Sequence, residues 1–165
     1  MTGRVKKFLL LLFTFLGCFC FAQDGNFYIT NFTPSMYGAN DQNWSVTQDS
    51  LGRVFVANLS GVMMYDGKYW KVIQMDDDKE AISLAKADDG TIYVGAAGEF
   101  GYIYFTDSGK VKYSSLSKSL PEKEKEFGNV WAIHVIGKDV FFCANEHVLW
   151  YQNNRFKKSF TPSGE

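Results

Sequence analysis

The feature that most constrains the fold is a fifteen-residue pattern that returns three times along the chain. In each copy an apolar residue lies eleven positions before an aromatic residue, Phe55, Tyr93 or Phe142, and a turn with glycine separates the two. Apolar runs rich in β-branched and aromatic residues, on both sides of such a turn, predict a pair of antiparallel strands. The copies are Trp44–Asn58, Ile82–Ala96 and Trp131–Asn145.

The distance between the copies predicts the architecture. They begin 38 and then 49 residues apart, and repeats of about 40 to 50 residues are typical of the four-stranded blades of a β-propeller. We therefore expect an all-β fold with about three four-stranded blades, near residues 40–75, 80–117 and 128–160. The longer second interval contains a charged stretch, 116–127, which we expect to be a solvated insertion.

Three blades make an incomplete propeller, since closed propellers have about four to eight blades. The two outer blades would then expose sheet surface and strand edges. We expect these surfaces to pack against the remaining blades or downstream domains of a longer receptor, or to self-associate. An isolated chain is expected to oligomerise.

The N-terminus has the pattern of a signal-peptide helix. Arg4, Lys6 and Lys7 precede an apolar run, 8–21, and Ala22 ends a small-x-small site. We predict a signal peptide at residues 1–22, cleaved after Ala22, and a periplasmic or secreted mature chain, 23–165.

Two alternatives for this segment remain open. One is a membrane anchor, although the fourteen apolar residues at 8–21 are fewer than the roughly 20 that span a bilayer. The other is a lipoprotein site at Cys18, which follows the small residue Gly17. We expect no transmembrane span in the mature chain.

Loss of the leader changes the charge and the cysteine content. It removes three of the 17 basic residues and none of the 18 acidic ones, leaving a formal net charge of −4. Such a chain is a poor partner for nucleic acid. Cys143 is the one remaining cysteine, and we expect it to be a small buried side chain rather than a reactive thiol.

One segment carries a family resemblance. The run Gly61–Trp70, GVMMYDGKYW, resembles the G-L-x-x-Y-D-G-x-x-W signature of two-component regulator propeller repeats, and 37–49 resembles the first blades of such sensors. The segments 104–107 and 150–153 lack the Tyr-Asp-Gly turn. The resemblance implies an N-terminal periplasmic sensor propeller of a triple-tyrosine, hybrid two-component or helix-turn-helix regulator. It also implies a non-enzymatic role in ligand sensing and signal transduction.

Propeller ligands usually meet the loops at one end of the channel, and we expect this end to be where the inner strands begin. An amide beside an indole suits a sugar, because the ring stacks on the apolar sugar face while the amide forms directed hydrogen bonds. The alternative is that the tryptophans pack between blades. The candidate ligand-binding residues, for an oligosaccharide, are Asn43, Trp44, Glu99, Tyr102, Asn129 and Trp131.

The sequence predicts no catalytic, metal or cofactor site. Asp76–Asp78 lacks the alternating oxygen ligands of a calcium loop, and His134 and His147 have no ligands at zinc spacing. The segment Gly95–Gly101 is expected to be a turn between strands, since no helix follows to bind phosphate. Asp41, Glu99 and Tyr102 are the only candidates for acid–base chemistry.

Two other functions remain open beside the sensor. A secreted propeller enzyme that acts on polysaccharide would need a carboxylate pair, or a carboxylate with His, Tyr or Arg, at the channel. An envelope scaffold would recruit its partner through exposed strand edges.

Overall fold

The computed structural model describes residues 3, 5–8 and 28–161. The chain divides into two compact units, Met1–Asn31 and Phe32–Glu165. In the first unit, residues 5–8 are helical, while most of the predicted signal peptide, including the cleavage position and Cys18, lies outside the described residues. None of the helices in the described part of the chain has the length and apolar character needed to cross a membrane.

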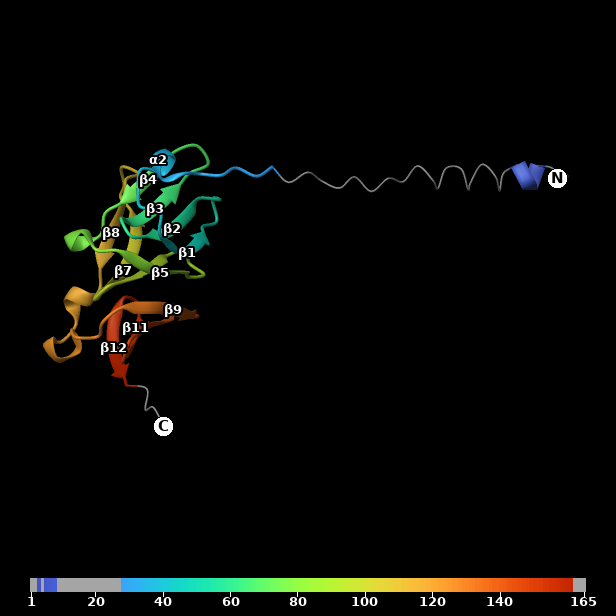
Figure 1. The fold of residues 1–165 in the computed structure, drawn as a ribbon. Coiled ribbons are helices and arrows are strands. Elements are labelled where there is room, and N and C mark those ends of the chain that lie inside the picture. The colour runs from blue at the N-terminus through green and yellow to red at the C-terminus, as the bar shows by residue number, and fades with distance from the viewer. Residues whose placement is uncertain (1–2, 4, 9–27, 162–165) are drawn as a thin grey trace. The chain divides into compact units, whose positions relative to one another are not determined.

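The second unit contains three four-stranded antiparallel sheets in sequence order. They follow one another along the chain from the teal to the red segment of Figure 1. This arrangement confirms the predicted all-β fold of incomplete propeller blades. Blade 1 is β1 (Asn43–Gln48), β2 (Val54–Asn58), β3 (Gly61–Tyr65) and β4 (Trp70–Ile73). Blade 2 is β5 (Ala81–Lys86), β6 (Ile92–Ala96), β7 (Glu99–Phe105) and β8 (Val111–Ser115). Blade 3 is β9 (Val130–Ile136), β10 (Asp139–Ala144), β11 (Val148–Gln152) and β12 (Arg155–Phe160).

The first strand of each blade is the inner one, because β5 contacts both β1 and β9. Side chains near the start of these strands join neighbouring blades. Ser45 Oγ accepts a hydrogen bond from Leu84 N at 3.3 Å, and Ser83 Oγ donates one to the Val130 carbonyl at 2.9 Å. The residue that opens each repeat, Trp44, Ile82 or Trp131, is a bulge between the first and second strands.

The third repeat differs in register from its sequence pattern. Phe55 pairs with Thr47 and Tyr93 with Ala85, but in blade 3 the equivalent residue is Phe141, not Phe142. The reason is the length of the turn between the first and second strands of each blade. This turn has five residues in blade 1 (49–53) and in blade 2 (87–91), but only two in blade 3 (137–138). A shift of one residue moves a side chain to the opposite face of a sheet. Phe142 therefore packs back toward blade 2.

Two apolar cores lie between the blades. One joins blades 1 and 2 through residues such as Phe55, Val62 and Val94. The other joins blades 2 and 3 through residues such as Phe100 and Phe142. The second strands of the blades differ in burial: β6 is buried on both faces, whereas β2 and β10 contain both buried and half-buried residues.

The segment 116–127 is not simply solvated, contrary to expectation. It forms two short 3-10 turns, η2 (Ser117–Ser119) and η3 (Glu122–Glu124). Most of its charged residues face solvent, but Leu116, Leu120 and Phe127 are buried in the core of blades 2 and 3. Three apolar anchors thus hold an otherwise hydrophilic connection against the blades.

A short segment before blade 1 packs on its outer strand. Helix α2 (Pro34–Tyr37) contacts β4. The ring of Phe32 lies 5.1 Å from Tyr65 and 5.2 Å from Trp70 between centroids. Tyr65 and Trp70 stack on each other at 4.8 Å. The signature residues Gly61–Trp70 therefore form the β3–β4 hairpin and an outer aromatic cluster.

Candidate functional site

The candidate site lies at the end of blade 2 where the inner strands begin. Three connections meet there: β4–β5 with η1 (Asp76–Asp78), the β6–β7 turn, and the β8–β9 connection with η2 and η3. The β6–β7 turn consists of Ala97 and Gly98, as expected for the glycine-rich segment, with Gly98 at a φ of +60°. Gly98 N donates to the Gly128 carbonyl at 3.0 Å, which ties this turn to the β8–β9 connection.

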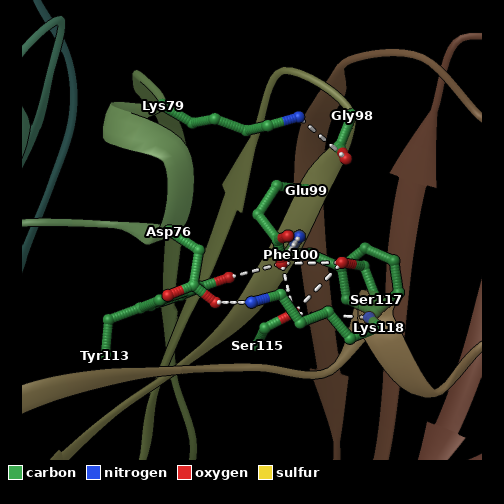
Figure 2. A network of polar contacts seen from close by, with 9 residues as sticks. All are labelled: Asp76, Lys79, Gly98, Glu99, Phe100, Tyr113, Ser115, Ser117 and Lys118. Carbon is green, nitrogen blue, oxygen red and sulfur yellow. Dashed lines mark hydrogen bonds and ion pairs between the residues drawn. The ribbon is translucent and has the colours of Figure 1, made fainter.

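Glu99 begins β7 and is buried, with 4% of its surface exposed. Its Oε1 accepts four hydrogen bonds, which Figure 2 shows together. The donors are Phe100 N at 3.0 Å, Tyr113 Oη at 2.8 Å, Ser115 Oγ at 2.8 Å and Ser117 Oγ at 2.7 Å. These donors are neutral, and Glu99 forms no ion pair with any described residue. Hydrogen bonds of this kind offset the cost of taking a carboxylate out of water.

A glycine allows Tyr113 to reach Glu99. Gly101 lies on β7 opposite Ser115, and a Cβ atom at this position would lie 2.6 Å from Tyr113 Oη and 2.7 Å from Cζ. It would also contact the Ser114 carbonyl. In the other blades the equivalent residues are Met63 and Leu149. The polar network is thus built on a position that carries a large side chain in blades 1 and 3.

Tyr113 donates rather than accepts in this network. Burial and the charge of Glu99, in that order, raise the pKa of the Tyr113 phenol far above its ordinary value. The phenol therefore stays protonated and keeps donating to Glu99 across the physiological pH range. Its role is to orient the carboxylate.

The second carboxylate oxygen, Glu99 Oε2, accepts no hydrogen bond from the described residues. Glu99 lines a cavity of about 280 Å³. The other lining residues are Asp77, Lys79, Gly98, Ser117, Lys118, Lys125 and Phe127. A buried carboxylate with a free acceptor atom thus faces a cavity bordered by three ammonium groups.

The three lysines differ in their partners. Lys118 pairs with Asp76 at 2.8 Å, and Lys125 pairs with Glu122 at 2.7 Å. Lys79 Nζ instead donates to two backbone carbonyls, of Ala97 at 3.1 Å and Gly98 at 3.4 Å, and forms no ion pair with a described residue. Its charge therefore remains available to a ligand.

The connection that carries Lys79 has an unusual backbone. Asp77 and Asp78 both have positive φ, 57° and 51°. Residues other than glycine adopt this region at a cost, and such residues concentrate at functional sites. Asp77 also lines the cavity.

The structure brings some of the predicted ligand-binding residues together and separates others. Asn129 forms a β-bridge with Ala97, beside the turn that precedes Glu99. Tyr102 lies on the face of β7 opposite to Glu99. Its ring centroid is 6.5 Å from that of Tyr93 and 6.2 Å from that of Tyr104. Tyr113, rather than Tyr102, is the tyrosine that contacts Glu99.

The other predicted residues mark the inner-strand starts of blades 1 and 3. Trp44 is 47% exposed and Trp131 is 51% exposed, so neither ring is buried between the described blades. Trp131 Nε1 donates to Asn145 Oδ1 at 3.1 Å. Asn43 Oδ1 accepts from Asn58 Nδ2 at 2.8 Å, while Asp41 is exposed.

Sequence reasoning missed Tyr113, Ser115, Ser117 and Lys79. These residues lie 14 to 20 positions from Glu99 along the chain, and none belongs to a recognisable motif. Their proximity comes from the pairing of β7 with β8 and from the return of the connections to one end of the blade. The buried glutamate in an apolar strand was the available signal.

A larger cavity, of about 400 Å³, lies at the opposite end, between turns of blades 2 and 3. It is lined by Asp88, Asp89, Lys138, Asn153 and Asn154 among others, and its charged lining residues are exposed. It lacks the buried charge of the Glu99 site. Within the described part of the chain, no group of three or more His, Cys, Asp or Glu side chains is placed to hold a metal.

Comparison with known proteins supports the fold. No protein-family model matches this chain, and no curated protein matches it. Thirteen chains of solved structures do match. One is virginiamycin B lyase from Staphylococcus aureus, with a TM-score of 0.54 and 16% identity. The alignment covers 76% of this chain and 44% of the lyase, so this chain spans less than half of that protein. At such identity the likeness shows the fold alone, a β-propeller.

Proposed function

We propose that this chain is a ligand-sensing segment of an extracytoplasmic propeller, part of a receptor of the two-component or transcriptional regulator type. The observation that carries the proposal is the Glu99 cavity. It combines a buried, oriented carboxylate, a free acceptor atom and an unpaired lysine in a concave site. Small-molecule sites have this character: a few fixed polar groups in a hollow between elements.

The ligand is a glycan in this proposal. Glu99 Oε2 accepts from a sugar hydroxyl, while Trp44 and Trp131 are exposed at the inner-strand starts of the two blades that flank blade 2, as rings available for stacking. The leader and the Gly61–Trp70 resemblance support a periplasmic or secreted location and a signalling role.

A second candidate is a polysaccharide-cleaving enzyme, since one fold can carry many unrelated chemistries. The contact of Glu99 with Tyr113 at 2.8 Å provides a carboxylate and a phenol in one site. The far raised pKa of Tyr113 makes this phenol a poor base near neutral pH. This supports binding without chemistry.

The receptor proposal includes a partner for the outer face of blade 3. Five positions face the next blade in every blade. In blade 1 they are Phe55, Ala57, Val62, Met64 and Ile73, all buried in the core with blade 2. In blade 3 the equivalent residues are Phe141, Cys143, Val148, Trp150 and Phe160, which are half-buried or exposed. The occupant is a further four-stranded blade that continues the series of interfaces between blades.

Cys143 provides the test of this partner. It is half-buried on the uncovered face, contrary to the expectation that it is buried, and partial burial raises the pKa of its thiol. We expect alkylation of Cys143 to be at least tenfold slower in the native protein of the cell envelope than in the isolated chain. Equal rates would exclude a covering blade. The intact mass of the native protein, detected with an antibody against residues 28–161, then shows whether the blade belongs to the same polypeptide.

The sensing function is tested by titrating the full chain with a panel of neutral and acidic oligosaccharides. Tryptophan fluorescence and calorimetry are the measurements. We expect at least one glycan to bind the parent chain and the Lys86→Gln variant alike, because Lys86 is exposed at the far end of β5. The Glu99→Gln variant should bind it at least tenfold more weakly. Flat titrations with folded parent chain would contradict the proposal, and turnover of a glycan would favour the enzyme.

A further inference from the structure

We infer that the Glu99 cavity takes a hydroxylated acid of monosaccharide size, a sugar acid, whose hydroxyl donates to Glu99 Oε2 and whose carboxylate binds Lys79. This inference rests on the proposed ligand-binding function and names the ligand class of the same site. It follows from which atoms of the cavity already have partners and which do not.

The hydroxyl half of the ligand follows from Glu99. Its Oε1 is held by four donors, so the carboxylate cannot turn to offer that atom. Oε2 remains an acceptor at a side chain that is 4% exposed. An ionised carboxylate oxygen accepts hydrogen bonds and donates none. The ligand therefore presents a donor at this point.

The acid half follows from Lys79. Its ammonium contacts the carbonyls of Ala97 and Gly98, which are neutral, so no described side chain neutralises it. An ammonium group has three donors, and the two carbonyls leave one for a ligand. Lys118 and Lys125 line the same cavity, but each is paired with a carboxylate. A negatively charged group of the ligand therefore fits the Lys79 side of the cavity.

Lys79 also disfavours a ligand amine. A cation placed at Glu99 Oε2 would share the cavity with the Lys79 ammonium group, and like charges in one site repel. A neutral hydroxyl satisfies the same acceptor without this cost. Asp77, the second carboxylate of the lining, accepts another hydroxyl of a polyhydroxylated ligand.

The cavity limits the size of the ligand. Its volume of about 280 Å³ is at the low end of small-molecule sites, about 300 to 1,000 Å³. One sugar ring, rather than several, fits inside. A longer glycan would place its terminal acidic residue in the cavity and direct its remainder toward solvent.

The experiment compares three probes of one shape on the full chain: galacturonate, galactose and galactosamine. Calorimetry measures their affinities for the parent chain, Lys79→Gln, Glu99→Gln and the control Lys86→Gln. We expect galacturonate to bind the parent chain about tenfold more tightly than galactose, because a charge-assisted contact is added. Lys79→Gln should abolish this preference without weakening galactose. Glu99→Gln should weaken both sugars, and Lys86→Gln should change neither.

The outcomes separate this inference from the broader proposal. If galactose binds as tightly as galacturonate, or if galactosamine binds best, the acid inference is overturned while the ligand-binding function stands. If galacturonate fails to bind the folded parent chain, the inference is also overturned. The proposal of a ligand-sensing function fails only if none of the oligosaccharides in the panel binds either. Lys79→Gln alters a partly exposed side chain, so it tests the inference even if Glu99→Gln does not fold.

Discussion

In blade 1 the buried Asn58 holds the start of the inner strand, whereas in blade 2 the equivalent residue is Ala96 and the polar side chain is Glu99, three positions later. Asn58 Nδ2 donates to the carbonyls of Asn40 at 2.6 Å and Gln42 at 3.0 Å, and to Asn43 Oδ1. These contacts are internal and complete. Glu99, by contrast, keeps one oxygen free beside a cavity. At the same end of the blade, the amide of Asn58 in blade 1 has all its partners within the protein, whereas Glu99 in blade 2 keeps an acceptor atom that a ligand can use.

Blade 3 also has an asparagine that holds the start of its inner strand, but this asparagine is exposed. Asn145, just after β10, accepts from Asn129 N at 2.9 Å and from Trp131 Nε1, but it is exposed while Asn58 is fully buried. Blades 1 and 3 thus use an asparagine to hold the start of the inner strand, whereas blade 2 lacks this amide and carries the Glu99 cavity at the same end.

The largest expected effect follows from removing the tie in blade 1. Asn58→Ala leaves the Asn40 carbonyl without its donor and Ser60 N without its acceptor, while the Gln42 carbonyl keeps only the bond from Leu59 N. Each unsatisfied buried group costs about 1 to 3 kcal/mol, so we expect a loss of about 3 kcal/mol in the free energy of unfolding, measured by urea denaturation. The matched variant Asn145→Ala should lose about 1 kcal/mol, since its contacts are exposed. Equal losses would contradict the distinction between the two ties.

The second prediction concerns the glycine of blade 2. Gly101→Ala places a methyl group against the Tyr113 ring and the Ser114 carbonyl. Overpacking of this kind costs about 1 to 3 kcal/mol, and it should displace Tyr113 from Glu99. A crystal structure and urea denaturation of the variant are the measurements. An unchanged Tyr113–Glu99 contact would mean that Gly101 does not make room for the network.

Much of the scaffold was predictable from sequence because its signals are local. Apolar runs and turn residues within fifteen positions define each strand pair, and the three blades follow from their repetition. The register of blade 3 was not predictable, since Phe141 and Phe142 are chemically identical and only the length of the turn at 137–138 distinguishes them.

The site was predictable only in part. Glu99 is conspicuous as a charge in an apolar strand, but Tyr102, the other candidate named on this strand, lies on its opposite face. Its true partners come from β8 and from η2, whose positions depend on sheet pairing and on the burial of Leu120. These contacts are tertiary, so no short sequence motif predicts them.

The third prediction uses the phenol that distinguishes blade 2. The residues equivalent to Tyr113 are Trp70 in blade 1 and Phe156 in blade 3, and neither ionises. The folded-state pKa of Tyr113 is raised, so the unfolded chain releases this proton first. Stability is therefore full below about pH 10 and falls as pH rises above it, by at most about 1.4 kcal/mol per pH unit.

Urea denaturation between pH 9 and 11.5 measures this slope. Tyr113→Phe should reduce it. Tyr151, whose pKa burial raises to about 12, contributes in the same direction and keeps part of the slope in the variant. If the parent chain and Tyr113→Phe lose stability in parallel, Tyr113 is not held as a protonated donor.

The smallest expected effect lies at the opposite end of the blades. There the charged side-chain contact is in blade 1 rather than in blade 2. Asp49 Oδ2 pairs with Arg53 Nε at 2.6 Å in the first turn of blade 1. The equivalent positions of blade 2 are Ala87 and Thr91, which are joined to each other only through the backbone, by Ala87 N and the Thr91 carbonyl at 2.8 Å. Although burial opposes it, hydrogen bonding from Arg53 and Leu51 holds the pKa of Asp49 below its ordinary value.

The stability that this carboxylate contributes is therefore present above about pH 4 and is lost as the pH falls further. Asp49→Asn should cost about 1 kcal/mol at pH 7, because one charge-assisted contact in a partly exposed turn is lost. It should cost less at pH 3, which is below the ordinary pKa of an aspartate, because part of the stability from the ionised carboxylate is already lost there. Urea denaturation at both pH values measures the difference. A cost that is the same at pH 3 and pH 7 would mean that the charge of Asp49 does not stabilise the turn of blade 1 and that the ion pair adds nothing.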